Sequence, residues 1–450
     1  MGRGALRHAA IGLRDALTTQ VWPLPTLGVA LAVVLGVALP QLDAVTVLPD
    51  GLTGYLFGRG ADAARSVLGT IAGSLITVTA LTFSLTVVTL QLASSQFSPR
   101  LLRTFTRDRV VHLTLALFLA TFTFAVVVLR TVRSAASGRA EFVPEMSVTV
   151  AVLLTLASVI GLVLFLSHLA TTIRVETMLV TVHTDAREAA LGDHVPRGVT
   201  RPALEPPPDA VVVLARRSGF LLDVEEEGLL AAVCGQESCL RVDRVPGDWV
   251  VAGTPLGLAW RLDGEPTDDD VRRQLQSCVD AGVSVGRERT LHQDMAFGLR
   301  QLTDVAVKAL SPGINDPTTA VHALGHSAAL LCELAGGELG PRRLVDADGR
   351  VRVELRRASL DDLVRLAVDQ PRRYGASDPD VLARLLALLA DLAWAADPVE
   401  AEPCVRRELG RLQQTVAAGS DLDPHDRDRL SQGAEQVERA LRREWVRGPA

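Results

Sequence analysis

The sequence predicts a membrane all-α domain of four transmembrane helices, followed by an α+β domain made of a small β module and a helical bundle. Four long apolar runs before residue 172, each free of Asp, Glu, Lys, Arg and His, are the first observation behind this prediction. Each run has about the length that a helix needs to cross a hydrocarbon core, roughly 17 to 25 residues. The second observation is that no such run follows residue 172, where short strands and amphipathic helices are indicated instead.

The four runs predict a transmembrane domain over residues 21–172, with short connections that leave no room for an external domain. A secretory signal peptide is the competing interpretation of the first run, but three more spans follow it and no clean cleavage site stands out. The runs are Val21–Leu42, Ser66–Pro99, Leu113–Leu129 and Met146–Ser167.

Charged residues predict the orientation of these spans. Four spans place both termini on the same side of the membrane. Arginines precede the first run and crowd the connection between the second and third, so the positive-inside rule places residues 1–20 and the C-terminal part in the cytoplasm. All five cysteines lie in that C-terminal part, and an odd number of unpaired thiols is typical of a reducing compartment. The arginines concerned are Arg3, Arg7, Arg14, Arg100, Arg103, Arg107 and Arg109.

The C-terminal part divides by composition into three segments. Residues 173–209 indicate a helical extension of the fourth span and a proline-rich linker. Residues 210–265 indicate a small β module, in which Gly247, Asp248, Val250 and Gly253 resemble the hairpin of biotinyl and lipoyl carriers. The lysine that such carriers modify is missing, because the chain's one lysine lies elsewhere, and a swinging-arm function is therefore excluded.

Residues 266–450 predict a helical domain, with helices at about 289–310, 316–335, 359–369, 379–396, 403–418 and 425–446. A further helix opens at "PTDDDVRRQLQSC", where Thr267 or Asp268 is the expected N-cap. The three consecutive aspartates are also a candidate cation site, but capping is the better interpretation because helix starts commonly have this composition.

Polar side chains form two opposite stripes on the second apolar run when it is treated as a helix. Threonines at 79, 82, 86 and 89 share one face, while the other carries hydroxyls interrupted by apolar residues. The second stripe predicts a pore-lining face, since hydroxyls replace part of an ion's hydration and apolar rings close a pathway by dewetting. Its predicted lining is Thr70, Ser74, Thr77, Leu81, Ser84, Val88, Gln91 and Ser95, and its predicted inner mouth is Arg100, Arg103 and Arg107.

The alternative interpretation of this run is packing alone. Small and hydroxylated residues let membrane helices approach closely, and Gly69 and Gly73 form a pair of that type. The arginines also serve as topology anchors in many proteins. Whichever interpretation holds, no ionisable residue lies inside the four runs, which disfavours a proton-coupled carrier relative to a passive channel.

A second conspicuous stretch, "KALSPGINDPTTAVHALGHSAA", predicts a turn between two helices. Pro312 and Gly313 break the first helix, and Asn315 or Asp316 caps the next, with Pro317 at its first position. The turn is also a candidate ligand site, either for an anion at the backbone N–H groups after Asp316 or for a cation at Asn315 and Asp316. The residues of this candidate turn are Ser311, Gly313, Asn315 and Asp316.

Signals for catalysis, metals and cofactors are weak or absent. His322 and His326, four residues apart, share a helix face but have no obvious third ligand, and the spacing of Cys234 and Cys239 fits no common zinc pattern. "GHSAA" lacks the second glycine of a nucleophile elbow, and no Walker or dinucleotide motif is present. The sequence therefore predicts no enzyme, no metal and no cofactor.

Two long segments resemble a known family. "FSLTVVTLQLASSQFSPRLLRTF" and "LHQDMAFGLRQLTDVAVKALSPGINDPTTA" are similar to the bacterial membrane proteins of the domain of unknown function 2254 family, over about residues 20–445. The resemblance implies an integral protein of the bacterial inner membrane with a cytoplasmic domain. It supplies no catalytic residue and no established activity.

The predicted function is an oligomeric, ion-channel-like passive pore lined by the second span, with a cytoplasmic domain that assembles or gates it. Its expected partners are the lipid bilayer, further copies of the chain and inorganic ions, but no nucleic acid. The alternative is a membrane-anchored cytoplasmic sensor or scaffold without conduction, centred on the Ser311–Pro317 turn.

Overall fold

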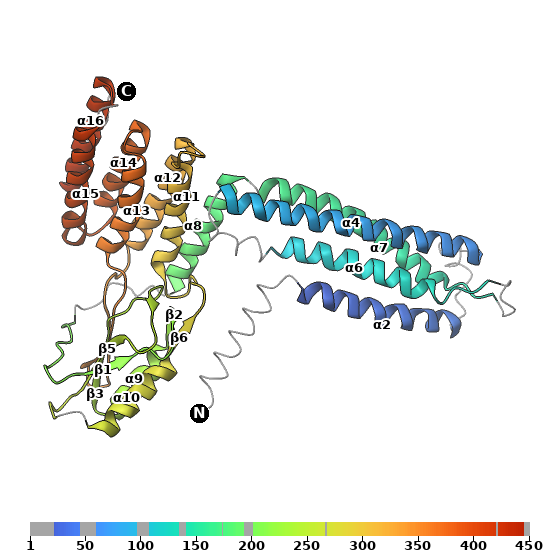
Figure 1. Cartoon of the computed structure of the whole chain (residues 1–450), viewed down its shortest axis with the longest axis horizontal. Helices are drawn as coiled ribbons and strands as arrows, with labels where there is room; N and C mark the ends of the chain where they lie inside the picture. The colour runs from blue at the N-terminus through green and yellow to red at the C-terminus, as the bar shows by residue number, and fades with distance from the viewer. Residues whose placement is uncertain are drawn as a thin grey trace. The chain divides into compact units, whose positions relative to one another are not determined.

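The computed structural model describes residues 22–45, 60–96, 108–134, 141–172, 174–192, 201–265, 268–419 and 422–444. The chain divides into two compact units between Arg174 and Val175 (Figure 1). The fourth apolar helix ends at Thr172 and a new helix begins at Val175, so the expected extension of that span is a separate helix in the second unit.

The described part of the first unit holds four helices that are long and apolar enough to cross a membrane, which confirms the predicted transmembrane domain. They are α2 (Pro23–Val45), α4 (Ala61–Gln96), α6 (Arg109–Leu129) and α7 (Glu145–Thr172).

Helix α6 lies at the centre of this unit and packs against each of the other three helices. Half of the residues in its apolar stretch are buried within the protein, whereas the buried share in the other three helices is 28% or less. Phe118 and Phe124 are buried on it. Glycines on α2 allow the closest approach: a Cβ at Gly36 would lie 2.9 Å from Cγ1 of Val127, and one at Gly28 would lie 3.1 Å from the carbonyl oxygen of Ala116.

Charged side chains tie the connections together at one end of the bundle. The carboxylate of Asp43, near the end of α2, accepts from the Ser147 hydroxyl at 2.8 Å and caps the first turn of α7. Glu141 accepts from the N–H of Ala61 at the start of α4, and Arg65 donates to the carbonyl of Val132 beyond α6. These bonds satisfy helix-end groups that would otherwise be unpaired.

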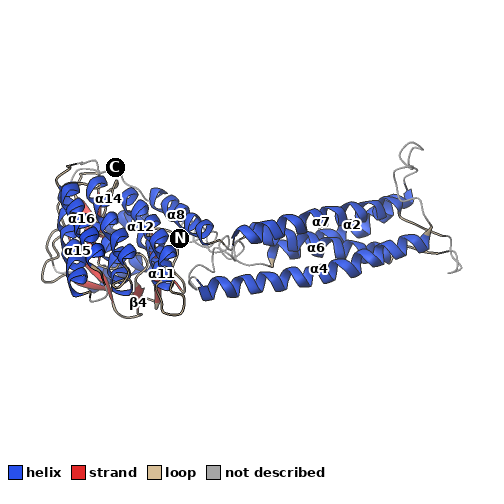
Figure 2. Cartoon of the chain, turned by 90° about the horizontal axis from the view of Figure 1, so that it is seen from above, coloured by secondary structure: helices blue, strands red, loops and turns tan. Residues whose placement is uncertain are grey.

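Helix α4 is longer than its neighbours. Its 36 residues span about 54 Å, whereas the 21 residues of α6 span about 32 Å. Since Arg65 fixes the two helices at a common end, the last turns of α4 extend roughly 15 Å past the start of α6. Figure 2 shows this overhang.

The second unit contains two β-sheets. The larger has the order β1-β5-β3-β8-β7 and the smaller the order β4-β2-β6. Their strands are β1 (Val211–Leu214), β2 (Gly219–Val224), β3 (Ser238–Val242), β4 (Trp249–Val250), β5 (Pro255–Arg261), β6 (Val283–Gly286), β7 (Arg342–Val345) and β8 (Val351–Leu355).

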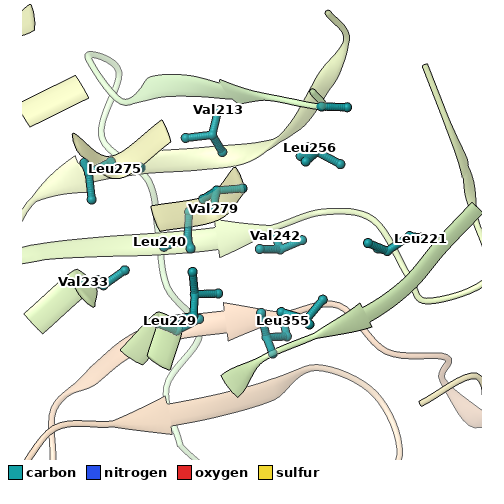
Figure 3. Packing of buried hydrophobic residues seen from close by; sticks show 14 of the residues in the cluster. Val213, Leu221, Leu229, Val233, Leu240, Val242, Leu256, Leu275, Val279 and Leu355 are labelled. Atoms are coloured by element: carbon teal, nitrogen blue, oxygen red, sulfur yellow. The ribbon is translucent and has the colours of Figure 1, made fainter. Parts of the chain in front are cut away.

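The sheets depart from the expected module in two ways. They take β6, β7 and β8 from the region expected to be helical, and β8 pairs in parallel with β3. A helix, α9 (Glu226–Gly235), interrupts the expected run of strands, with Glu225 as its N-cap. With α10 (Asp269–Gly282) it contributes Leu229, Leu275 and other side chains to the core between the sheets (Figure 3).

The remaining helices confirm the predicted helical part of an α+β region, and they form a stack of hairpins in two layers. Helices α11, α13 and α15 pack in sequence in one layer, and α12, α14 and α16 in the other, while α8 packs on α11 and α12. Their bounds are α8 (Val175–Gly192), α11 (Met295–Ala309), α12 (Pro317–Leu334), α13 (Leu360–Tyr374), α14 (Pro379–Ala395), α15 (Pro398–Ala418) and α16 (Pro424–Leu441).

Aspartate caps explain where most of these helices begin. Asp268 accepts from the N–H of Val271, which confirms the predicted cap of α10. Helices α12, α14, α15 and α16 each start with Asp followed by Pro, so a carboxylate accepts the free N–H groups and the fixed φ of proline suits the first turn.

Candidate functional site

The two polar stripes of α4 face opposite ways. Thr79, Thr82 and Thr89 are buried against the rest of the membrane unit. The predicted pore-lining residues are exposed on the other side, including Leu81 at 59% and Val88 at 48%. The described residues that share this exposed face are Thr70, Ser74, Thr77, Leu81, Ser84, Val88 and Gln91.

Three hydroxyls of the exposed stripe donate within their own helix. Thr70 donates to the carbonyl of Ser66 at 2.8 Å, and Thr77 to that of Gly73 at 3.1 Å. Ser74 donates to the carbonyl of Ile71. The donors are therefore satisfied in a bilayer, and the oxygen lone pairs remain available to water, an ion or another helix.

Gly73 lies on this same face and Gly69 on its border. A Cβ built at either glycine meets no atom within 4 Å. The glycines of α2 differ, because a Cβ at Gly28 or Gly36 would contact α6. The face is therefore free of contacts within the described part of one chain.

The overhang divides the predicted stripe. Residues up to about Ser84 lie alongside α6, whereas Val88 and Gln91 lie on the extending turns of α4. The side chain of Ser95, and the predicted inner mouth formed by Arg100, Arg103 and Arg107, lie outside the described residues.

Two pairs of polar side chains join α6 and α7 inside the membrane unit. Asp108 caps α6 by accepting from Val110 at 2.9 Å, and its second oxygen lies 2.5 Å from Nε2 of His168 on α7. The hydroxyls of Thr121 and Ser158 lie 3.2 Å apart between α6 and α7. The spacing of residues in the sequence does not reveal that these side chains meet.

The predicted turn between α11 and α12 is confirmed as a turn. Asp316 caps α12, accepting from the N–H of Thr319 at 3.0 Å and from its hydroxyl at 2.5 Å. These hydrogen bonds from Thr319 lower the pKa of Asp316. Asn315 adopts a φ of +50°, and Ser311 donates to the carbonyl of Lys308. The capping carboxylate is thus occupied by its own helix.

A seam of ionisable side chains joins α8 to α12. His322 contacts Glu176, and the rings of His183 and His326 meet edge to face with centroids 5.5 Å apart. Glu333 lies near both His183 and Arg187. The seam was missed from the sequence because its two halves are more than 140 residues apart. Among the described residues, no group of three or more His, Cys, Asp and Glu side chains is arranged to hold a metal ion.

A buried ion pair joins the β module to the start of α11. Asp294 accepts from Nε of Arg289 at 2.9 Å and from its NH2 nitrogen at 3.0 Å. Burial raises the pKa of Asp294 to about 6, although Arg289 opposes that shift. The backbone of Gly247, with φ of +95°, lies directly against this pair.

Comparison with known proteins decides the family. The model of the predicted membrane proteins DUF2254 matches residues 18–391. The chain belongs to the DUF2254 family. This confirms the resemblance drawn from the α4 segment and from the stretch that runs through α11.

Similar chains occur in mycobacteria. An uncharacterised protein of Mycobacterium bovis and one of Mycobacterium tuberculosis are each 39% identical over 394 residues, which cover 84% of this chain and 73% of theirs. A protein of a second M. tuberculosis strain is 38% identical over 393 residues. No solved structure matches the chain.

Proposed function

We propose that this chain assembles into a homo-oligomer that forms a passive pore for inorganic ions in the bacterial inner membrane. In this proposal α4 of each copy faces the central axis, the arginines that follow it form the inner mouth, and the second unit lies in the cytoplasm and assembles or gates the pore. No catalytic residue is assigned.

The observation that carries the proposal is the orientation of α4. Its hydroxyl and glycine face points away from α6 and α7, the helices it packs against, so the polar stripe is left for a neighbouring copy or for water. Four spans are too few to enclose a pathway lined on all sides by this face. Copies arranged around an axis supply such a lining.

The absence of ionisable residues from the four apolar runs supports passive conduction rather than proton-coupled transport. Carriers and pumps driven by protons commonly place an Asp, Glu or His near mid-membrane. Here Asp43, Asp108 and His168 lie at the ends of the bundle.

Conductance of the purified protein in a planar bilayer under a salt gradient tests the proposal. We expect discrete current steps, with a reversal potential that reports selectivity. Ser84→Trp is expected to lower the single-channel current at least about twofold by narrowing the lining, and Leu81→Asp to shift selectivity towards cations. Phe83→Trp is the matched control, since Phe83 is exposed on α4 but lies about 100° away from the stripe. Absence of current from wild type and variants alike would contradict the pore.

The second candidate is a membrane-anchored sensor or scaffold. It is favoured by the stacked hairpins of the second unit and by Ile314, which is 37% exposed at the tip of the ordered turn before α12. A scaffold leaves ion flux through proteoliposomes at background for every variant of α4.

A further inference from the structure

Two loops of the β module meet at one edge of the smaller sheet. The loop after β1 contributes Ala215–Ser218, and the turn after β4 contributes Val251–Thr254. Gly253 donates to the carbonyl of Ala215 at 2.8 Å, and Ala215 donates to that of Thr254 at 2.9 Å. Ala252 donates to the hydroxyl of Ser218 at 2.9 Å. The two loops therefore form one ordered surface.

This surface exposes apolar side chains. Trp249 is 55% exposed and Val251 is 48% exposed. The ring of Phe220 packs against Trp249 at 4.9 Å between centroids with an angle of 88°, which holds the indole in place. No described residue accepts from the indole N–H. A fixed tryptophan with a free polar group suits an environment that is apolar on one side and wet on the other.

Three arginines lie at the same end of the smaller sheet, two of them in the loop beside β4 and one after β6, the strand at the opposite edge. Arg216 and Arg217 lie in the first loop, and Arg287 follows Gly286, which pairs with Phe220. The exposed guanidinium of Arg216 lies 3.8 Å from the carboxylate of Asp280. The side chains of Arg217 and Arg287 are exposed and have no partner among the described residues. We call Trp249, Val251 and these three arginines the Trp249 patch.

We propose that the Trp249 patch docks on the headgroup region of an anionic bilayer. Tryptophan is enriched at the membrane–water interface, and arginines at an anionic surface each strengthen binding about fivefold. The four spans of the chain keep the second unit close to a bilayer, so a weak surface suffices. Strand addition to β4 by another protein is less favoured, because β4 has two residues and offers few backbone hydrogen bonds.

Quenching of tryptophan fluorescence by brominated phospholipids tests the docking on the full chain. The protein is reconstituted in nanodiscs of phosphatidylcholine alone and of phosphatidylcholine with phosphatidylglycerol at about three to one. The contribution of Trp249 is the quenching that Trp249→Phe removes. We expect this contribution in the anionic discs, and we expect added salt to reduce it.

Charge reversal separates docking from fold. Arg217→Glu with Arg287→Glu is expected to lower the Trp249 quenching about tenfold or more in anionic discs. Arg272→Glu with Arg442→Glu, two exposed arginines elsewhere without described side-chain partners, makes the same change in net charge and is expected to leave the quenching unchanged. Trp394→Phe removes another exposed tryptophan and is expected to leave it unchanged too.

Three results would overturn the proposal. One is an absence of Trp249 quenching in both lipid compositions, and another is equal loss of quenching in the two charge-reversed proteins. In the third, Trp249 is protected from aqueous quenchers, and this protection increases with the density of protein in the disc but not with the content of anionic lipid. That result would assign the patch to contacts between proteins. None of these results depends on whether the chain conducts ions.

Discussion

Backbone geometry at single residues explains why certain glycines stand in the β module. Gly247 and Gly253 flank β4 with φ of +95° and +80°, a region that other residues enter at a cost of about 1 to 2 kcal/mol. Their surroundings differ. A Cβ at Gly247 would lie 2.2 Å from Oδ2 of Asp294, whereas one at Gly253 meets nothing within 4 Å.

Substitution of these two glycines should therefore have unequal effects. We expect Gly247→Ala to lower the free energy of unfolding by about 3 kcal/mol or more, since it adds displacement of the buried Asp294–Arg289 pair to backbone strain. Gly253→Ala is expected to cost only the strain, about 1 to 2 kcal/mol. Thermal unfolding of the two variants in detergent measures the difference. Equal losses of stability would contradict the prediction, because they would show that the Asp294–Arg289 pair moves aside at no cost in free energy.

At the scale of secondary-structure elements, the seam between α8 and α12 determines how the second unit responds to pH. Burial lowers the pKa of His326, and the neighbouring charge of His183 lowers it further. Glu176 and His183 lie on α8 across the seam from His326, and His322 lies on its own helix, α12. Arg187 and Glu333 form an ion pair further along the seam. The neutral form of His326 is thus the form that folding favours.

The sign of the pH dependence follows from that shift. When the folded-state pKa is below the usual value of about 6.5, the unfolded chain binds more protons as the pH falls, and stability is lost below about pH 6.5. We expect the Tm of His326→Gln to fall less than that of wild type between about pH 7.5 and 5.5. Asp294, whose raised pKa acts in the opposite direction, contributes equally to both proteins. Identical pH profiles would contradict a neutral His326 in the fold.

The element boundaries also show which sequence signals are strong. The four membrane helices and the predicted Asp316 cap are as the sequence predicts, because long apolar runs and Asp–Pro starts act locally. The strands β6, β7 and β8 were missed, since each is five residues or shorter and pairs with segments far away in the chain. Helix α9 was missed because its apolar residues form one short continuous run, Leu229–Cys234, which has no helical period and equally fits a buried strand.

For the whole molecule, the central question is what covers the exposed face of α4. In a single chain this face carries Gly73 with open space above it, while the opposite face holds the bundle together. Small residues on a membrane helix allow close approach of a second helix. The proposed oligomer places that second helix on an adjacent copy.

Enlarging Gly73 tests this assembly directly. We expect Gly73→Leu to leave the fold of one chain intact, because a Cβ at this position meets no atom within 4 Å. We expect it to shift the oligomer towards smaller species by about tenfold in apparent dissociation constant. Mass photometry or cross-linking in nanodiscs measures the distribution. Gly410→Leu, on α15 and also without atoms within 4 Å of its Cβ, is the control outside the membrane unit. An unchanged distribution in both variants would place the interface elsewhere.

The sequence by itself determined the membrane class, the four spans, the helix caps and the two opposite stripes of α4, because each depends on composition or on spacing within one helix. The tertiary structure decided which stripe is buried, that α6 is the central helix, and that α4 extends past its neighbours. It also decided the contacts made by distant segments: the seam of His183 with His326, the buried pair of Asp294 with Arg289, and the loops of the Trp249 patch. These contacts depend on which elements pack together. The packing energy that favours one arrangement of elements comes from many side chains, so no single sequence motif predicts it.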